Sequence, residues 1–293
     1  MKFCRFVQVV VMFLGLQGSE IFAQNNDPID SLYFPGIRQA TISNPVLEEI
    51  SGLAVSRKYP NLIYVHTDSG GDAAVYMLDS LGRELGTVEL EGAINRDWED
   101  IAVGLGARGE SYVYVGEIGD NAGIHSEILI YRFPEPQAVK KVQQVKPEIL
   151  KLTYPDGPRD SETLMVDPIS GDLFIVTKRD DKNSIFRVSQ KAFSTGKAVL
   201  EPLLRLGFTG AVAGDISADG TEILIKNYFA VYYWERKSGE SVGQALQRKP
   251  KRLPYVPEPQ GEAIGFDDDA SSYFTLSEKR FSIDPVLYRY PKK

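Results

Sequence analysis

A pattern of two short apolar strands that end in polar residues recurs five times in this chain of 293 residues, and it constrains the fold more than any other feature. Each copy starts at a small or acidic residue, passes through a glycine- or aspartate-containing turn, and ends in a polar cluster. The copies begin at Ser51, Glu99, Glu162, Gly214 and Glu262, which are 48, 63, 52 and 48 residues apart. Periods of this length with about four strands each are typical of the blades of a β-propeller.

The sequence between the repeats contains further period-two apolar segments, which complete four-stranded blades. The last copy lacks an outer strand, and the unassigned segment 37–42 near the N-terminus can supply it. Pairing the two ends of the chain in one blade closes the ring and removes an exposed sheet edge. We therefore predict an all-β fold, a single propeller over residues 37–293 with five blades. Six blades remain the alternative if the long second repeat hides another.

The N-terminus carries its own signal. Lys2 and Arg5 precede an apolar run, and Ala23 before Gln24 is a suitable cleavage position, which predicts a secretory signal peptide over residues 1–23. The run is shorter than the roughly 20 residues of a membrane span. We expect a secreted or periplasmic protein without membrane insertion after cleavage, and a polar tether over residues 24–36. The single cysteine, Cys4, falls in the signal, so zinc–thiolate sites and cysteine nucleophiles are excluded from the mature chain.

The formal net charge of −7 and the absence of a Lys/Arg run disfavour nucleic-acid binding. Only two histidines are present, His66 and His125, which leaves little material for a three-histidine metal site. The expected partners are a small anionic ligand or a component of the cell envelope, and we expect a monomer.

In a propeller blade the first strand lines the central axis and the second runs antiparallel to it, so all five polar clusters should meet at one mouth of the channel. Three glutamates take equivalent entry positions, and oxygen ligands from several blades suit Ca²⁺, which takes 6–8 oxygens. The predicted metal ligands are Glu99, Glu162 and Glu262. Candidates for catalysis are His66 and Glu117. Candidates for binding an anionic ligand are Lys178, Arg179, Lys226, Asn227, Lys279 and Arg280.

Two interpretations of this mouth remain open. A bound metal could polarise a phosphoryl or carbonyl oxygen and assist hydrolysis of an anionic ester. Alternatively, acidic and basic groups in similar numbers could form ion pairs that only hold the blades in register, in a non-catalytic binding or scaffolding module. Whether the protein is an enzyme is left open by the residues alone.

The segments Ile50–Ala54, Asp97–Ala102 and Gln260–Ile264 resemble secreted bacterial propellers of the esterase-like/phytase-like and SdiA-regulated kinds, which pair an "ISGLA" opening with later "EGIA"-type entries. The resemblance spans most of residues 45–290 and implies a TolB-like or NHL-like propeller. It also implies Ca²⁺-dependent ester or phosphoester hydrolysis, with Glu99, Glu162 and Glu262 as ligands. The chain departs from that pattern at Ser51 and Gly214 and adds Lys178, Lys226 and Lys279 to the ring.

Overall fold

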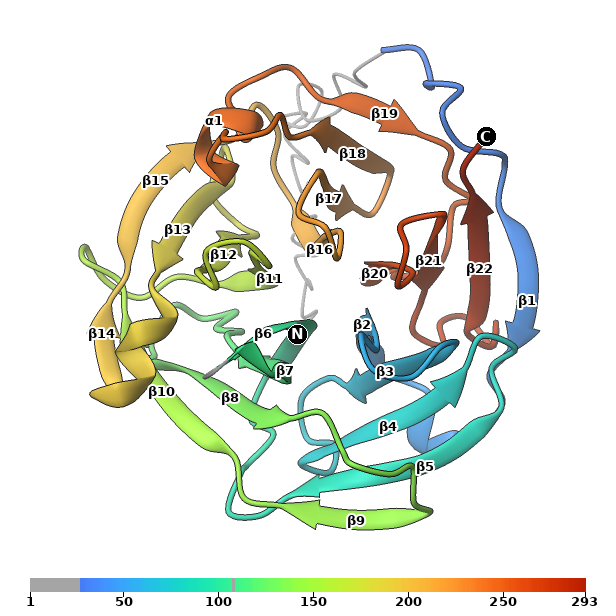
Figure 1. The fold of residues 1–293 in the computed structure, drawn as a ribbon, viewed down its shortest axis with the longest axis horizontal. Helices are drawn as coiled ribbons and strands as arrows, with labels where there is room; N and C mark the ends of the chain where they lie inside the picture. Colours follow the sequence, from blue (N-terminus) through green and yellow to red (C-terminus); the bar gives the residue numbers. More distant parts are fainter. Residues whose placement is uncertain (1–26, 107–108) are drawn as a thin grey trace, which may run out of the picture.

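The computed structural model describes residues 27–106 and 109–293, and in this part of the chain nearly all regular structure is β-strand. Five sheets, built mainly of antiparallel strand pairs, surround a central axis as the blades of a propeller (Figure 1). The predicted signal peptide lies outside the described residues. None of the helices that the structure describes could cross a bilayer.

The strands of the five blades, each from the axis outward, have the following bounds. Blade 1 contains β2 (Ile50–Val55), β3 (Leu62–Thr67), β4 (Ala74–Asp79), β5 (Glu84–Leu90) and β9 (Val142–Val145). Blade 2 contains β6 (Trp98–Leu105), β7 (Ser111–Glu117), β8 (Ile128–Pro134), β10 (Glu148–Thr153) and β14 (Lys197–Val199). Blade 3 contains β11 (Ser161–Val166), β12 (Leu173–Thr177), β13 (Ser184–Val188) and β15 (Glu201–Arg205).

Blade 4 contains β16 (Ala211–Ile216), β17 (Glu222–Asn227), β18 (Ala230–Glu235) and β19 (Lys251–Leu253). Blade 5 contains β20 (Ala263–Phe266), β21 (Ser272–Leu276), β22 (Val286–Pro291) and β1 (Ile37–Thr41). Short helical turns are η1 (Pro45–Leu47), η3 (Gln190–Ser194) and α1 (Val242–Leu246).

The ring closes as the sequence predicts. β1 pairs antiparallel with β22, so the first and last strands of the described chain share blade 5. The stretch before β1, expected to be a polar tether, packs against the ring in its described part: Tyr33 is buried, and its hydroxyl donates a hydrogen bond of 2.9 Å to Glu222 on β17.

Five blades are present, and the extra length of the second repeat does not form a sixth. Part of it forms β9, which crosses back to pair in parallel with β5 of blade 1. Similarly, β14 pairs in parallel with β10 of the preceding blade. The segment 137–145 therefore supplies a strand to blade 1. The outer strand of blade 4 begins only at Lys251, because the residues before it form α1, which starts at a capping box of Ser241 and Gln244.

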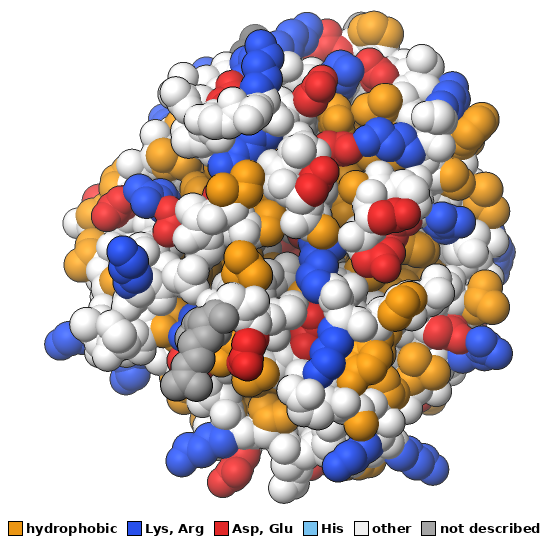
Figure 2. All heavy atoms as spheres, viewed as in Figure 1, with side chains coloured by type: hydrophobic (Ala, Val, Ile, Leu, Met, Phe, Trp, Pro, Cys, Tyr) orange, Lys and Arg blue, Asp and Glu red, His pale blue; other side chains and the backbone are white. Residues whose placement is uncertain are grey.

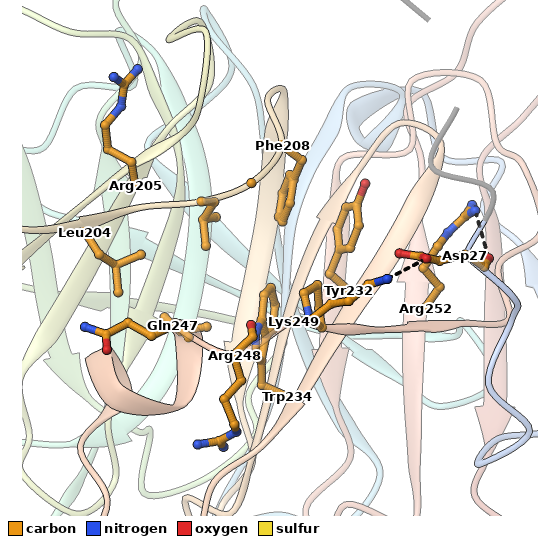
Figure 3. Close-up of a pocket in the computed structure, with 14 residues that line it drawn as sticks. Asp27, Leu204, Arg205, Phe208, Tyr232, Trp234, Gln247, Arg248, Lys249 and Arg252 are labelled. Atoms are coloured by element: carbon orange, nitrogen blue, oxygen red, sulfur yellow. Dashed lines mark hydrogen bonds and ion pairs between the residues drawn. The ribbon is translucent and has the colours of Figure 1, made fainter. Parts of the chain in front are cut away.

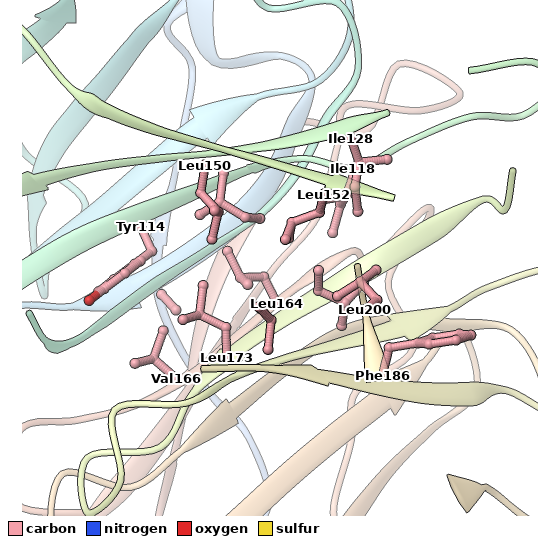
Figure 4. Packing of buried hydrophobic residues seen from close by; sticks show 14 of the residues in the cluster. Tyr114, Ile118, Ile128, Leu150, Leu152, Leu164, Val166, Leu173, Phe186 and Leu200 are labelled. Atoms are coloured by element: carbon pink, nitrogen blue, oxygen red, sulfur yellow. The ribbon is translucent and has the colours of Figure 1, made fainter. Parts of the chain in front are cut away.

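The hydrophobic core is divided among the interfaces between blades. Between blades 2 and 3, Leu150 and Leu152 meet Leu164 and Leu173 (Figure 4). Trp98 packs with Tyr64 and Tyr131 between blades 1 and 2, as a wedge at that interface. Each large side chain buried in this way stabilises the fold by roughly 1.5–3 kcal/mol, which lets a ring without disulfides hold together.

Buried aspartates tie the innermost strands to one another across the axis. Asp100 on β6 accepts hydrogen bonds from the backbone N–H groups of Leu164 in blade 3, at 2.8 Å, and Gly214 in blade 4, at 3.4 Å. Asp215 on β16 accepts from the N–H of Phe266 in blade 5 at 2.8 Å. These carboxylates satisfy backbone donors that adjacent first strands cannot pair by themselves.

At the opposite end of the axis from the first-strand entries, Arg57 crosses between blades. It follows β2, and its guanidinium donates to the carbonyl of Ile216 at 3.2 Å and to that of Asp267 at 3.4 Å. Arg57 thus joins blade 1 to blades 4 and 5.

Candidate functional site

The mouth face is the side of the ring on which the first strand of each blade begins and the second strand ends. A β-bulge marks the start of the first strand in blades 1 to 4, and the bulged residues are Ser51, Glu99, Glu162 and Val212. Glu262 holds the same place in blade 5, immediately before β20. The sequence alignment placed Gly214 at the fourth position. The observed register corrects this to Val212, two residues earlier.

The ends of the second strands supply the other side chains of the mouth face. The residue after the last paired position is Asp68 in blade 1, Lys178 in blade 3 and Tyr228 in blade 4. In blade 5 the equivalent residue is Glu278, whose N–H donates to Gln260, as the N–H of Lys178 does to Asp160. Blade 2 has one residue more at this point: Ile118 follows the last pair, and the next residue, Gly119, makes the equivalent contact by donating its N–H to Asp97.

Five acidic side chains from blades 1, 2 and 3 form a carboxylate cluster at this face: Asp68, Asp97, Glu99, Asp160 and Glu162. One oxygen from each of Asp68, Asp97 and Glu99 lies within 4.8 Å of the others, and the same is true of Glu99, Asp160 and Glu162. Glu99 therefore belongs to both groups. A set of carboxylate oxygens converging from separate blades is able to hold a metal ion.

Gly119 leaves the space that the cluster occupies. A Cβ atom at this position would lie 2.3 Å from Oε1 of Glu99 and 2.4 Å from Oδ2 of Asp97. Any larger residue would displace two of the five carboxylates, so the absence of a side chain in blade 2 is part of the site.

The cluster is short of positive charge. Glu162 is 2% exposed, and its Oε2 atom has no hydrogen-bond partner among the described residues. Burial raises the pKa of Glu99 well above its ordinary value, and the Glu162 carboxylate raises it further. Burial also raises the pKa of Glu162, against the lowering effect of Lys178. The pKa of Asp68 rises to about 6 through burial. The protein thus holds the carboxyl groups of Glu99, Glu162 and Asp68 where ionisation costs free energy.

A lysine and a tyrosine lie beside the cluster on the side of blades 4 and 5. Lys178 donates to Glu162 and, at 3.0 Å, to the hydroxyl of Tyr228, and its Nζ is 3.6 Å from Glu262. The Tyr228 hydroxyl donates to Glu262. Burial opposes the charge on Lys178, but the two glutamates outweigh it and hold its pKa above the ordinary value. Nearby, burial and Glu262 raise the pKa of Glu278 to about 9.

On the other side of the cluster, Arg179 connects it to a cavity. Its Nε lies 2.6 Å from Oδ2 of Asp160, and its side chain is half exposed. A cavity of about 610 Å³ is lined by Arg179, Arg159 and Phe186 together with parts of β15.

The two residues predicted for catalysis are both held by the fold. His66 is fully buried, its Nδ1 lies 3.2 Å from the carbonyl of Thr67, and burial lowers its pKa to about 4. Glu117 accepts hydrogen bonds from the N–H groups of Arg96 at 2.9 Å and Asp97 at 3.0 Å. Glu117 thereby fixes the loop that leads into β6. A catalytic role for either residue stays a prediction.

Of the six residues predicted to bind an anion, the structure brings Lys178 and Arg179 to the cluster. Lys226 is fully buried on β17 and donates to the carbonyl of Gly261, and burial lowers its pKa to about 8. Asn227 accepts from the backbone of the following turn.

The remaining two lie further out on the β21–β22 loop. Lys279 forms ion pairs with Glu48 at 2.6 Å and Asp284 at 3.3 Å. The guanidinium of Arg280 lies 5.8 Å from the centre of the Phe281 ring.

Tyr228 and Gly119 are site residues that reasoning from sequence missed. Both stand at the same structural position as Lys178, but a hydroxyphenyl group and a glycine share no chemical pattern with a lysine. The structure also places Asp68, Asp97 and Asp160 in the cluster. The recurring spacing to the first-strand entry is the signal that could have found them.

A second cavity, of about 550 Å³, lies at the outer rim between blades 3 and 4 (Figure 3). Phe208 stacks on Tyr232 there, with ring centres 3.8 Å apart. Its basic side chains already have partners: Lys249 pairs with Asp27 at 2.7 Å, and Arg248 pairs with Glu240.

On the face of the ring that Figure 2 displays, acidic and basic side chains are interspersed rather than gathered by sign. Such a surface differs from the continuous basic face by which proteins hold nucleic acids. The expectation that this protein binds no nucleic acid stays a prediction.

Comparison with known proteins adds little to this geometry. No protein-family model matches the sequence, and no curated protein sequence matches it significantly. Among solved structures, hydrazine synthase of Kuenenia stuttgartiensis is similar over 83% of this chain and 74% of that chain, with 12% sequence identity and a TM-score of 0.39. A likeness at that level carries no argument about function. The assignment of a five-bladed β-propeller rests on the sheet topology of the chain itself.

Proposed function

We propose that this protein binds a divalent cation, Ca²⁺ by preference, at the carboxylate cluster and through it an anionic ester or phosphoester. The observation that carries the proposal is the buried, unpartnered Oε2 of Glu162 beside Glu99 and Asp160. An ionised carboxylate oxygen in such a place costs free energy unless a cation or a proton reaches it.

The donor set favours a hard cation. Every candidate ligand is a carboxylate oxygen, the type that Ca²⁺ prefers, and the described site holds no histidine or cysteine ligand. Among the described residues, two basic side chains form ion pairs with the five carboxylates: Lys178 with Glu162 and Arg179 with Asp160. A divalent ion would offset much of the remaining negative charge.

The residues around the cluster suit an anionic ligand of the bound cation. A divalent cation polarises a phosphoryl or carbonyl oxygen and lowers the pKa of a coordinated water. Arg179 on one side and Lys178 on the other can donate hydrogen bonds to the anionic oxygens of an ester. This arrangement makes hydrolysis the reaction that the mouth would support.

A non-catalytic binding module of the cell envelope is the second candidate. The buried position of His66 favours it, because the imidazole could reach a ligand only if the start of blade 1 unpacked. Turnover in a panel of phosphatase, esterase and lactonase substrates, lost in Glu99→Gln, would decide for the enzyme. Cation and ligand binding without turnover would decide for the module.

Titration calorimetry of chelator-treated protein with Ca²⁺, Mg²⁺ and Mn²⁺ tests the cation site. We expect Ca²⁺ to bind with release of protons near neutral pH, because the pKa values of Glu99 and Glu162 are raised. Proton release is measured by repeating the titration in buffers of different ionisation enthalpy. Glu162→Gln should weaken binding at least about tenfold, the effect of losing one ligand-cation interaction of about 1.4 kcal/mol.

The matched control is Glu135→Gln. Glu135 is as buried as Glu162 but accepts hydrogen bonds from Ser56 and Tyr64 away from the mouth face. This variant should keep the affinity of the wild type for Ca²⁺. Absence of heat with all three cations, or equal affinity in Glu162→Gln and the wild type, would rule out the proposed site.

A further inference from the structure

The four most exposed large hydrophobic side chains of the described residues all lie on the mouth face. They are Phe281, 84% exposed, Ile94, 71%, and Ile124 and Phe229, 70% each. The most exposed side chain of this kind on the opposite face, Ile169 in the β11–β12 turn, reaches 64%. Single exposed apolar side chains are ordinary on protein surfaces, but here the four most exposed among the described residues share one face of the ring, and that face also carries the carboxylate cluster.

The position of each of these side chains follows from strand order. Ile94 lies in the connection from β5 to the start of β6, and Ile124 in the loop from β7 to β8. Phe229 forms the turn between β17 and β18, and Phe281 lies in the loop from β21 to β22. Loops from blades 2, 4 and 5 therefore project apolar tips on the side where the carboxylate cluster lies.

The loop that carries Phe281 is strained. Phe281 and Ser282 have φ angles of 53° and 61°, in the left-handed region that bulky residues rarely adopt. Backbone pairing of Arg280 with Ile283 holds this turn, and Ile283 is itself half exposed. Strained residues of this kind cluster at functional sites, and this one presents an aromatic ring to solvent.

Basic groups stand next to the apolar tips. The Arg280 guanidinium lies over the Phe281 ring, 5.8 Å from its centre. Arg179 of the β12–β13 loop is half exposed, pairs with Asp160 and contacts Asn121 in the loop that carries Ile124. Aromatic rings beside arginine and lysine are typical of surfaces that contact the headgroup region of anionic bilayers.

We infer that the mouth face docks on a membrane surface that contains anionic phospholipids. This inference rests on the proposed function, since the cation held by the carboxylate cluster bridges to a headgroup phosphate, which makes a phospholipid the anionic phosphoester. Phe281, Phe229, Ile124 and Ile94 enter the interface around it. Docking is reversible and requires the cation.

Separation of the apolar tips favours a bilayer over a protein partner. The tips form two groups, Ile94 and Ile124 at blade 2 and Phe229 and Phe281 at blades 4 and 5, and blades 1 and 3 lie between the two groups in the ring. The core of a protein interface is a continuous apolar area depleted of charge. A bilayer accepts separate insertion points and offers phosphates at many lateral positions.

Vesicle sedimentation tests the inference. The full-length mature protein is mixed with vesicles of phosphatidylcholine alone or with added phosphatidylglycerol, in Ca²⁺ or in chelator. We expect sedimentation only with phosphatidylglycerol and Ca²⁺. Phe281→Ser should lower the partition coefficient about tenfold, from the loss of one buried aromatic side chain. Ile169→Ser, on the opposite face, should leave it unchanged.

Calorimetry without lipid separates this inference from the proposed function. Phe281→Ser should bind Ca²⁺ as the wild type does. If the wild type binds Ca²⁺ but does not sediment with vesicles, the membrane inference is overturned and the cation site stands. Vesicle binding that persists in chelator also overturns it, as does a dimer in Ca²⁺ that Phe281→Ser dissociates. If no Ca²⁺ binds, the proposed function fails, and the inference with it.

Discussion

Replacing Glu99 by glutamine should stabilise the protein when no cation is bound, and Ca²⁺ should remove most or all of that advantage over the wild type. Glu99 and Glu162 are buried, and their nearest oxygens lie within 4.8 Å. Two unit charges at that separation repel by about 3.5 kcal/mol at an effective dielectric constant near 20. Lys178 offsets part of this through Glu162. We expect a gain in the free energy of unfolding of roughly 1–3 kcal/mol.

The gain should depend on pH with a defined sign. Because the folded-state pKa of Glu99 is raised, its carboxyl is neutral in the folded protein at pH values where the unfolded chain is already ionised. Protonation of Glu99 in the folded state therefore contributes to wild-type stability below the pKa of the unfolded chain, and this contribution is lost as pH rises through the raised pKa of the folded state. The advantage of Glu99→Gln should therefore be small near about pH 5 and grow toward about pH 8.

Thermal unfolding in chelator and in Ca²⁺, at both pH values, checks this prediction. Each kcal/mol corresponds to roughly 2–4 °C in Tm for a chain of this size. Ca²⁺ at about a hundred times its Kd should stabilise the wild type by about 2.7 kcal/mol, and Glu99→Gln much less. Glu135→Gln serves as control and should be destabilised under all four conditions, because Ser56 and Tyr64 lose a charged acceptor. A variant less stable than the wild type in chelator at the higher pH would refute the reasoning.

Three further predictions concern the same region. Gly119→Ala should reduce Ca²⁺ affinity at least about tenfold, or about 1.4 kcal/mol, because the new Cβ would occupy the space of two carboxylates. The control is Gly207→Ala, where a Cβ meets nothing within 4 Å, and calorimetry should show an unchanged Ca²⁺ affinity there. Asp100→Ala should lower the free energy of unfolding, measured by denaturant titration, by about 3–5 kcal/mol, because the substitution leaves backbone donors of three blades unpaired. A loss below about 1 kcal/mol would show that the blades do not depend on the Asp100 carboxylate. Lys178→Met should raise Ca²⁺ affinity, because it removes a competing positive charge beside the cluster. The control is Lys279→Met, which removes a surface ion pair and should leave the Ca²⁺ affinity unchanged. An unchanged affinity in both variants would place the cation away from Lys178.

Much of the fold could be predicted from local sequence. Apolar residues alternating with polar ones predict strands without reference to the rest of the chain, and five such repeats predict five blades. Closure by segment 37–42 follows from the missing outer strand of the last blade. The strands β9 and β14 could not be predicted in the same way, because each pairs with a strand of the preceding blade. Short polar segments such as Val142–Val145 take their structure from that distant partner.

The site was predictable in location more than in composition. Glu99, Glu162 and Glu262 share one position because the first strands begin alike, and repeat spacing alone places them on one face. Lys226, however, appeared equivalent to Lys178, whereas the register places Tyr228 there and buries Lys226 between blades 4 and 5. A shift of two residues along a strand keeps the polar character of its end but changes which side chain reaches the axis.

The sequence by itself determined the strands, their number of repeats and the face on which their polar ends gather, since these depend on periodicity and on strand direction. Only the tertiary structure decided which carboxylates meet, because the bulges of the first strands and the space left by Gly119 set distances of a few ångströms. Asp68, Asp97, Glu99, Asp160 and Glu162 come from three blades, and no local pattern encodes their convergence. Their proximity follows from the closure of the ring.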